Sequence, residues 1–549
     1  MLFRSDAQNF GRKFKIAFSG CRDEACGLAL MHDVGAIAAV RQENGQLKRG
    51  FQVYLGGGLG AIPHQAKLYS DFVPAEEMLP LVQAIGRVFS RLGEKKNRAK
   101  ARMKFLVAKL GMEEFAALVR EERQKLPDDP RWTGFLADAE AFREQPLKPP
   151  SQMDLAATSE EFRKWHRLNV QAQAQDGYSM VTVFLPLGDI ASWQLRALGQ
   201  LCRNYVRGTI RTTVDQNLLI HWVSNGDLPA FHQVLLRLNL AQPGADGMAN
   251  VTACPGTDSC KLGIASSRGL AAVLHEKFDN GMSDLAERDD IKIKISGCFN
   301  SCGQHHIANI GFFGGSRRVG PHVAPIFQVM LGGDSSHNAA SFALSVGKVP
   351  AKNVPGVIRK LTAVYLAERQ GQEGFTEFTN RLGKARIKQE LAEFERLPDF
   401  NSHPEYYSDN RQPWEYMMST GVGECAGEMV SQAEFLLEDA DRLSFEASLH
   451  LEAGRLEESA ATAFEAMKKA ADALLSVRGL LLSDRYDTVG EFRTHFGENG
   501  FLPQISEFFF RAAQEGPQNL DAEKVHQRVE EATLFVEEAH GVYSRTEIA

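Results

Sequence analysis

The stretch that decides the fold is IKIKISGCFNSC, residues 291–302. Isoleucine alternates with lysine or serine over 291–296, a pattern typical of a strand with one buried face. Lys294 would then lie on the solvent side. A glycine follows, and the cysteines Cys298 and Cys302 come next, separated by three residues. The stretch therefore predicts a half-buried strand that enters a tight loop carrying two thiols.

A second cysteine pair precedes this strand. In ACPGTDSCKLG, residues 253–263, Cys254 and Cys260 are separated by five residues. Thiolates are soft ligands that suit iron–sulfur iron, and a 4Fe–4S cube needs four of them. Structural zinc sites usually have pairs two to four residues apart, so zinc matches this spacing less well. Four unrelated buried cysteines are the remaining interpretation.

The order of strand, loop and strand around the second pair occurs twice. Residues 13–60 contain KFKIAFSGC, HDVGAIAAV and FQVYLGG, and residues 290–333 contain IKIKISGC, ANIGFFGG and FQVMLGG. Landmarks such as SGC and FQV recur at nearly constant spacing, which indicates an internal duplication. Cys21 and Cys26 occupy the place of the second pair in the first copy. We interpret them as relics of the duplication or as core residues.

The rest of the chain divides by pattern. Residues 75–93 and 97–125 have helical character, and 178–238 follow the order β-α-β-β-α of half a ferredoxin-like unit. Beyond residue 400 the chain is rich in Ala, Glu and Leu with helical period, which predicts an all-α bundle. We therefore expect an α+β protein followed by a helical bundle. The predicted domains are 1–145, 146–240, 241–398 and 399–549.

Bulk composition excludes several classes of protein. The net charge of −7 argues against general nucleic-acid binding. No run of 18 apolar residues is present, so no membrane span is predicted, and the N-terminal residues lack the apolar core of a signal peptide. Eight cysteines in 549 residues are too few for a disulfide framework. These features favour a cytoplasmic location.

The two cysteine motifs together resemble a known family. TACPGTDSCKLG with ISGCFNSCGQHH is similar to the cluster signature of the sirohaem-dependent nitrite and sulfite reductases. The resemblance implies α+β reductase domains and a 4Fe–4S cluster on Cys254, Cys260, Cys298 and Cys302. It also implies that Cys302 bridges the cluster to the sirohaem iron. Asn300 would donate a hydrogen bond near the cluster and tune its potential.

The activity implied is the six-electron reduction of sulfite to sulfide, or of nitrite to ammonia. The alternative is a non-catalytic iron–sulfur electron-transfer subunit that has lost the haem face. No flavin or NADPH module is recognisable in the sequence, so an electron donor protein, a ferredoxin or a flavoprotein, is the expected partner.

A basic motif near the start matches the family's substrate-side motif. It consists of Arg12, Lys13, Phe14 and Lys15. Sulfite and nitrite are anions whose reduction consumes protons, so fixed cations would bind the anion and donate or relay protons. A solvated basic strand edge is the alternative without the resemblance. The pair Phe14-Lys15 is more like the sulfite-reducing branch of the family.

The resemblance also implies a departure at the N-terminus. The family places a further half-domain repeat before the basic motif, so we expect a truncated chain or one piece of a split enzyme. A missing N-terminal half or a partner chain would complete the centre, and this chain alone is expected to hold sirohaem poorly.

Three further segments are candidates for a role. The basic stretch 95–104 could dock an acidic ferredoxin or form a solvated helix face. The glycine-rich residues 56–60 suggest a loop in close approach to a cofactor. His305 and His306 could be taken for haem ligands, but Cys302 fills that role by resemblance. Placement behind the ligands or on the surface is therefore expected for both histidines.

The C-terminal bundle resembles HEPN-type helical domains. The resemblance rests on AFEAMKKAADALL, residues 463–475, and GEFRTHFGENG, residues 490–500. Some HEPN proteins are ribonucleases with an Arg and a His a few residues apart. Arg493 and His495 are too close to fit that pattern, so we expect an interaction or dimerisation module.

Overall fold

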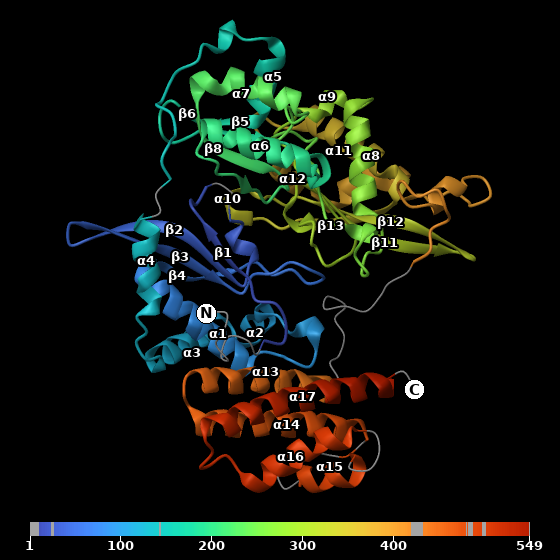
Figure 1. Cartoon of the computed structure of the whole chain (residues 1–549). Helices are drawn as coiled ribbons and strands as arrows, with labels where there is room; N and C mark the ends of the chain where they lie inside the picture. Colours follow the sequence, from blue (N-terminus) through green and yellow to red (C-terminus); the bar gives the residue numbers. More distant parts are fainter. Residues whose placement is uncertain are drawn as a thin grey trace.

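The structure is a computed structural model. It describes residues 10–23, 27–141, 144–418, 432–478, 480, 487–496 and 501–547, and Cys26 lies outside them. In Figure 1 a blue N-terminal sheet, a green α+β unit, a yellow-green second sheet and a red helical bundle follow one another along the chain. The predicted α+β architecture followed by a helical bundle is confirmed.

The first copy of the duplicated unit forms a four-stranded sheet of order β1-β2-β3-β4. Its strands are β1 (Ile16–Ser19), β2 (Val34–Glu43), β3 (Gln46–Leu55) and β4 (Lys67–Pro74). β1 and β2 run parallel, with Ile16 opposite Val34, and the other neighbours are antiparallel.

The second copy repeats this pattern and adds one strand, in the order β13-β12-β11-β10-β9. Its strands are β9 (Thr252–Ala253), β10 (Ile293–Ser296), β11 (Ile310–Val319), β12 (His322–Leu331) and β13 (Leu344–Pro350). β10 runs parallel to β11, with Ile293 opposite Ile310, as β1 does to β2. The internal duplication is therefore visible in strand order, direction and register.

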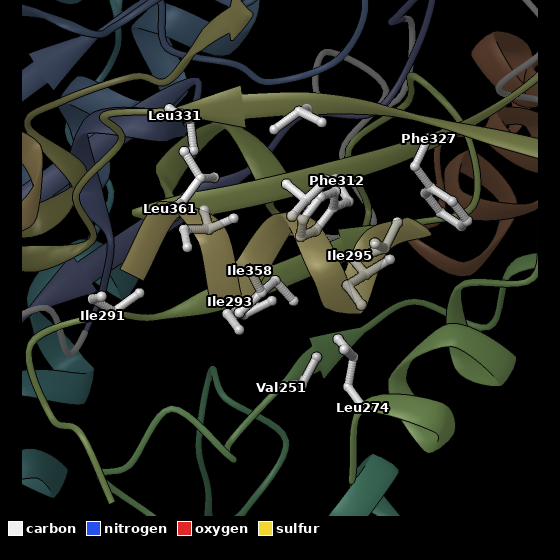
Figure 2. Packing of buried hydrophobic residues seen from close by; sticks show 14 of the residues in the cluster. Val251, Leu274, Ile291, Ile293, Ile295, Phe312, Phe327, Leu331, Ile358 and Leu361 are labelled. Carbon is white, nitrogen blue, oxygen red and sulfur yellow. The ribbon is translucent and has the colours of Figure 1, made fainter. Parts of the chain in front are cut away.

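Helices cover both sheets and bury their apolar faces. In the first copy they are α1 (Met78–Leu92), α2 (Met103–Leu110), α3 (Met112–Lys125) and α4 (Arg131–Ala141), and in the second α8 (Ser267–Asp279), α9 (Ser283–Ala286), α11 (Val354–Glu368) and α12 (Phe375–Leu391). The short α10 (Ser336–Ala339) packs instead against the turn Ala29–Met31 of the first copy. Figure 2 shows Ile293 and Ile295 packed among side chains of β11, β12, α8 and α11. Burying an aliphatic side chain of this size stabilises by about 1.5–3 kcal/mol.

The predicted half-buried character of the strand at 291–296 is wrong. All four residues of β10 are buried, because both faces of the strand are covered: Ile293 and Ile295 pack in the apolar core, and Lys294 lies against Asp215 of the ferredoxin-like unit. Lys294 is only 2% exposed, and its Nζ lies 2.6 Å from Oδ1 of Asp215. Its ammonium also donates to Oγ1 of Thr252 over 3.3 Å. Alternation failed here because a lysine is buried with its own counterion.

Removal of that counterion should destabilise the chain. Asp215→Asn leaves the Lys294 ammonium buried without a negative partner, and we expect a loss of about 3 kcal/mol in the free energy of unfolding. Urea denaturation measures this loss. The double variant Asp215→Asn/Lys294→Met, which has no buried charge at this place, should recover most of it. Equal stability of the wild type and Asp215→Asn would contradict the prediction.

The ferredoxin-like unit lies between the two copies in sequence. Its sheet has the order β5-β6-β8-β7, covered by α6 and α7 around one apolar cluster. Its elements are α5 (Glu160–Asn169), β5 (Val170–Ala172), β6 (Tyr178–Val183), α6 (Ser192–Tyr205), β7 (Arg211–Thr212), β8 (Leu218–Ser224) and α7 (Leu228–Arg237). The order of β6, α6, β7, β8 and α7 is the predicted β-α-β-β-α.

The C-terminal bundle contains α13 (Gln432–Glu452), α14 (Leu456–Val477), α15 (Thr488–Phe496), α16 (Pro503–Glu515) and α17 (Ala522–Glu547). In Figure 1 it lies beside the helices of the first copy, with α13 nearest to them. Alanines on α14 and phenylalanines on α15 and α16 share its core. Within the described residues, no helix is both long and apolar enough to cross a bilayer.

Candidate functional site

Two parallel strands bring the cysteine pairs to one edge of the second sheet. β9 runs directly into Cys254, and β10 runs into Gly297 and Cys298. Parallel strands end at the same edge of a sheet, so the two loops meet there. The N–H of Cys254 donates to the carbonyl of Ile295 over 3.1 Å, and the N–H of Gly297 donates to Sγ of Cys254 over 3.1 Å.

Glycines allow the two cysteine loops to touch. A Cβ on Gly297 would lie 2.6 Å from the Cα of Gly256, and a Cβ on Gly314 would lie 2.4 Å from the carbonyl oxygen of Gly297. Neither approach is open to a residue with a side chain. The glycines around the cysteines therefore keep the two pairs together.

The thiols themselves are crowded. Cys298 is buried, and burial raises the pKa of its thiol to about 11. The neighbouring thiols of Cys254 and Cys302 contribute to this raised pKa, whereas the backbone N–H and the side chain of Asn300 hydrogen-bond to Cys298 and counteract it. Cys260 and Cys302 are exposed. A positively charged iron cluster would replace the thiol protons and relieve the repulsion among thiolates.

The four cysteines supply the soft thiolate donors that iron–sulfur iron prefers. Among the described residues, no three His, Cys, Asp or Glu side chains lie close enough to hold one metal ion. A 4Fe–4S cube contacts each thiolate through a different iron, so its ligands stand farther apart than those of a single ion.

A cavity of about 570 Å³ lies beside the second cysteine pair, between the two copies. The predicted residues Arg12, Lys13, Lys15, Asn300 and Cys302 all line it. The structure therefore brings the basic motif and the second pair together, although more than 280 residues separate them in sequence. A cavity rich in cations is suited to small anions and to the carboxylates of sirohaem.

A buried carboxylate organises the cations. Asp33 is fully buried and accepts hydrogen bonds from Nη2 of Arg102, over 2.7 Å, and from the backbone N–H of Lys15, over 3.0 Å. Desolvation in the cavity lowers the pKa of Lys15, and the charges of Arg102 and Lys13 lower it further. An anion in the cavity would stabilise the charged form of Lys15.

Lys104 holds the glycine-rich loop that forms another wall. Its Nζ donates to the carbonyls of Leu59, over 2.9 Å, and Ile62, over 2.6 Å. Burial lowers the pKa of Lys104 to about 8. Gly60 of the same loop lines the cavity, and its close approach to a cofactor stays a prediction.

The basic stretch 95–104 was predicted to be exposed, either as a docking site for a ferredoxin or as a solvated helix face. Both predictions are wrong for Arg102 and Lys104. Arg102 and Lys104 are buried and line the cavity. Arg98 instead pairs with Glu438 of α13, Nη2 to Oε1 at 2.8 Å. Sequence reasoning missed Arg102, Lys104 and His32 as cavity residues. The only local sign of burial in the sequence was that Arg102 and Lys104 alternate with apolar residues. That alternation resembled the rest of the run of basic residues.

The comparisons with known proteins indicate the family of the chain. Residues 2–126 and 244–397 match the family "Nitrite and sulphite reductase 4Fe-4S domain", and 171–238 match the "Nitrite/Sulfite reductase ferredoxin-like half domain". The chain is 26% identical to the assimilatory ferredoxin-dependent nitrite reductase of Haloferax mediterranei, over 74% of this chain and 66% of that protein. It is 27% identical to sulfite reductase [ferredoxin] 1 of Mycolicibacterium paratuberculosis, over 69% of this chain and 64% of that protein.

A solved structure, the NirA protein of Mycobacterium tuberculosis, superposes with a TM-score of 0.55 at 27% identity. The match covers 69% of this chain and 64% of that one. The chain spans slightly less than two thirds of the length of these relatives.

The fold and the cysteine site thus define an iron–sulfur reductase domain built on a duplicated sheet. The chain belongs to the nitrite and sulphite reductase 4Fe-4S domain family. The predicted ferredoxin-like half-domain is confirmed. Reductases of this family use sirohaem with a 4Fe–4S cluster, so both predicted cofactors are confirmed at the level of the family.

Proposed function

We propose that this chain contributes to the six-electron reduction of sulfite or nitrite at a sirohaem bridged to a 4Fe–4S cluster. Cys254, Cys260, Cys298 and Cys302 would hold the cluster, and Cys302 would be the bridge. The observation that supports this most strongly is that Cys302 and Asn300 line the same cavity as Lys13 and Lys15. A chain that only carried a cluster would not need cations next to one of its cysteines.

When bound, the two cofactors would supply electrons one at a time and a metal site for the anion. The chain's own residues would do the rest. Arg12, Lys13 and Lys15 would bind the anion and stabilise negative charge on its oxygens. The ammonium groups of the two lysines would donate protons, which each reduction step consumes. The carboxylate of Asp33 would keep Lys15 in place by accepting the hydrogen bond of the Lys15 backbone N–H.

The electron donor would be a separate protein that carries one electron at a time. The relatives named above are a ferredoxin-dependent nitrite reductase and a sulfite reductase [ferredoxin]. A ferredoxin is therefore the first donor to test, and a flavoprotein is the second. The relatives include a nitrite reductase and a sulfite reductase, so both anions belong in every assay.

The visible spectrum of the full chain, expressed with a supply of sirohaem, tests the proposal. Sirohaem bands, even weak ones, together with iron and acid-labile sulfide would support it. A plain cluster spectrum without haem would favour the non-catalytic iron–sulfur subunit instead. A protein without iron would contradict both functions.

Anion binding should weaken as the pH rises. Deprotonation removes the positive charge of Lys15, and the lowered pKa of Lys15 places this loss below the pH at which an ordinary lysine titrates. We expect about tenfold weaker nitrite binding for the uncharged form, since a charged hydrogen bond contributes about 1.5–3 kcal/mol. Nitrite suits this test because its own charge does not change in the alkaline range.

Nitrite titrations of the loaded protein between pH 7 and pH 10, followed by the haem spectrum, measure this effect. Lys15→Arg is the control, because arginine stays charged over that range. The alkaline fall should be smaller in Lys15→Arg than in the wild type. Identical pH profiles would show that Lys15 is not the titrating group.

A further inference from the structure

His305 and His306 follow the second cysteine pair, and the proposed function leaves them without a role. The structure places both inside the protein, with His305 fully buried and His306 5% exposed. The surface placement considered for them is therefore wrong. Their ring centroids lie 4.2 Å apart. Neither ring is among the residues that line the cavity.

His305 is bonded to the loop that carries Cys298 and Cys302. Its Nδ1 lies 2.9 Å from Oγ of Ser296, the last residue of β10. The same hydroxyl accepts the N–H of Gly303 over 3.0 Å. One buried hydroxyl thus joins the residue before the cysteine loop to two residues after it, and this closes the loop.

His306 is bonded to the other wall of the cavity. Its Nε2 lies 3.0 Å from the carbonyl oxygen of Gly60, in the glycine-rich loop of the first copy. A carbonyl can only accept, so Nε2 must carry the proton. A Cβ on Gly60 would lie 3.9 Å from the carbonyl oxygen of Asn300, so the two loops come close together here.

Burial lowers the pKa of both histidines, so both rings are neutral near pH 7. Each neutral ring then has one donor and one acceptor nitrogen, and each uses one of them to hold a loop. Adjacent rings in van der Waals contact transmit a displacement of one loop to the other, because packed interiors deform little.

We propose that His305 and His306 form a clasp that fixes the position of the Cys298–Cys302 loop relative to the glycine-rich wall of the cavity. Both are positioning residues and not ligands. The role of the clasp, to hold Cys302 at a set place in the cavity, rests on the proposed function. The hydrogen bonds that form the clasp lie within this chain and do not depend on that function.

Hydrogen exchange of the full chain tests the clasp without any cofactor. His306→Leu removes the donor to Gly60, and we expect roughly tenfold faster amide exchange in residues 56–62 and a smaller increase in 297–303. His306→Gln keeps an N–H donor and should restore slow exchange. Ser296→Ala should accelerate exchange in 297–303. Ser19→Ala, the same position in the first copy, is the matched control and should leave 297–303 unchanged.

Cofactor retention is the second readout. Ser296→Ala should lose cluster iron to a chelator about tenfold faster than the wild type, and His306→Leu should bind sirohaem about 10- to 100-fold more weakly with normal acid-labile sulfide. Equal exchange in His306→Leu and His306→Gln would overturn the clasp. A changed haem coordination spectrum in His306→Leu or His306→Gln would also overturn the clasp, because it would identify His306 as a haem ligand. A wild type that takes up no cofactor would overturn the proposed function only, because hydrogen exchange still tests the clasp.

Discussion

Cys302→Ser should remove the coupling between cluster and haem and most of the cluster itself. Serine presents a hard oxygen in place of a soft thiolate, which iron–sulfur iron binds poorly. The loss of a direct ligand should exceed the roughly 10- to 100-fold effect of losing an outer-shell partner. Acid-labile sulfide and the haem spectrum, measured on the same preparation, give both effects at once.

Cys21→Ser controls for the loss of a cysteine in the first copy. Cys21 follows Ser-Gly in the first copy as Cys298 does in the second, and it is not among the predicted cluster ligands. The iron content, acid-labile sulfide and haem spectrum of Cys21→Ser should equal those of the wild type. A normal haem spectrum in Cys302→Ser would exclude Cys302 as the bridge, whereas sulfide loss in Cys21→Ser would mean that the first copy also binds a cluster.

The double variant Lys13→Met/Lys15→Met should weaken binding of sulfite and of nitrite by about 100-fold or more. Each lysine contributes one charge-assisted hydrogen bond to the anion, and such bonds contribute about 1.5–3 kcal/mol each. Methionine keeps the length of the side chain, so the cavity should keep its shape. Anion titrations of the loaded protein, followed by the haem spectrum, measure the dissociation constants.

Lys48→Met controls for the loss of a positive charge elsewhere. Lys48 lies on β3 and pairs with the exposed carboxylates of Glu43 and Glu76, and it does not line the cavity. Anion affinity should be unchanged in this variant, and thermal unfolding of all variants shows whether they fold equally. Wild-type affinity in the double variant would contradict the role of Lys13 and Lys15.

Most of the architecture could be predicted because its signals are local. The SGC and FQV landmarks revealed the duplication, and the β-α-β-β-α order of 178–238 indicated the ferredoxin-like unit. The cysteine spacing pointed to a cluster, and the comparisons place the chain in the corresponding family. The ligand set and the role of Cys302 stay predictions. The HEPN resemblance of the bundle likewise stays a prediction.

The sequence by itself determined which chemistry is present: two cysteine pairs with glycines around them, and a basic motif in the first of two repeats. Tertiary structure alone decided which charges are buried and which loops meet. Lys294 is inside because Asp215, from another domain, neutralises it, and Arg102 is inside because of Asp33. The second cysteine pair was visible from the start, but its closure through Ser296 and its contact with Gly60 through His306 were not. Alternation and spacing describe neighbours along the chain, whereas these bonds join residues that only packing brings together.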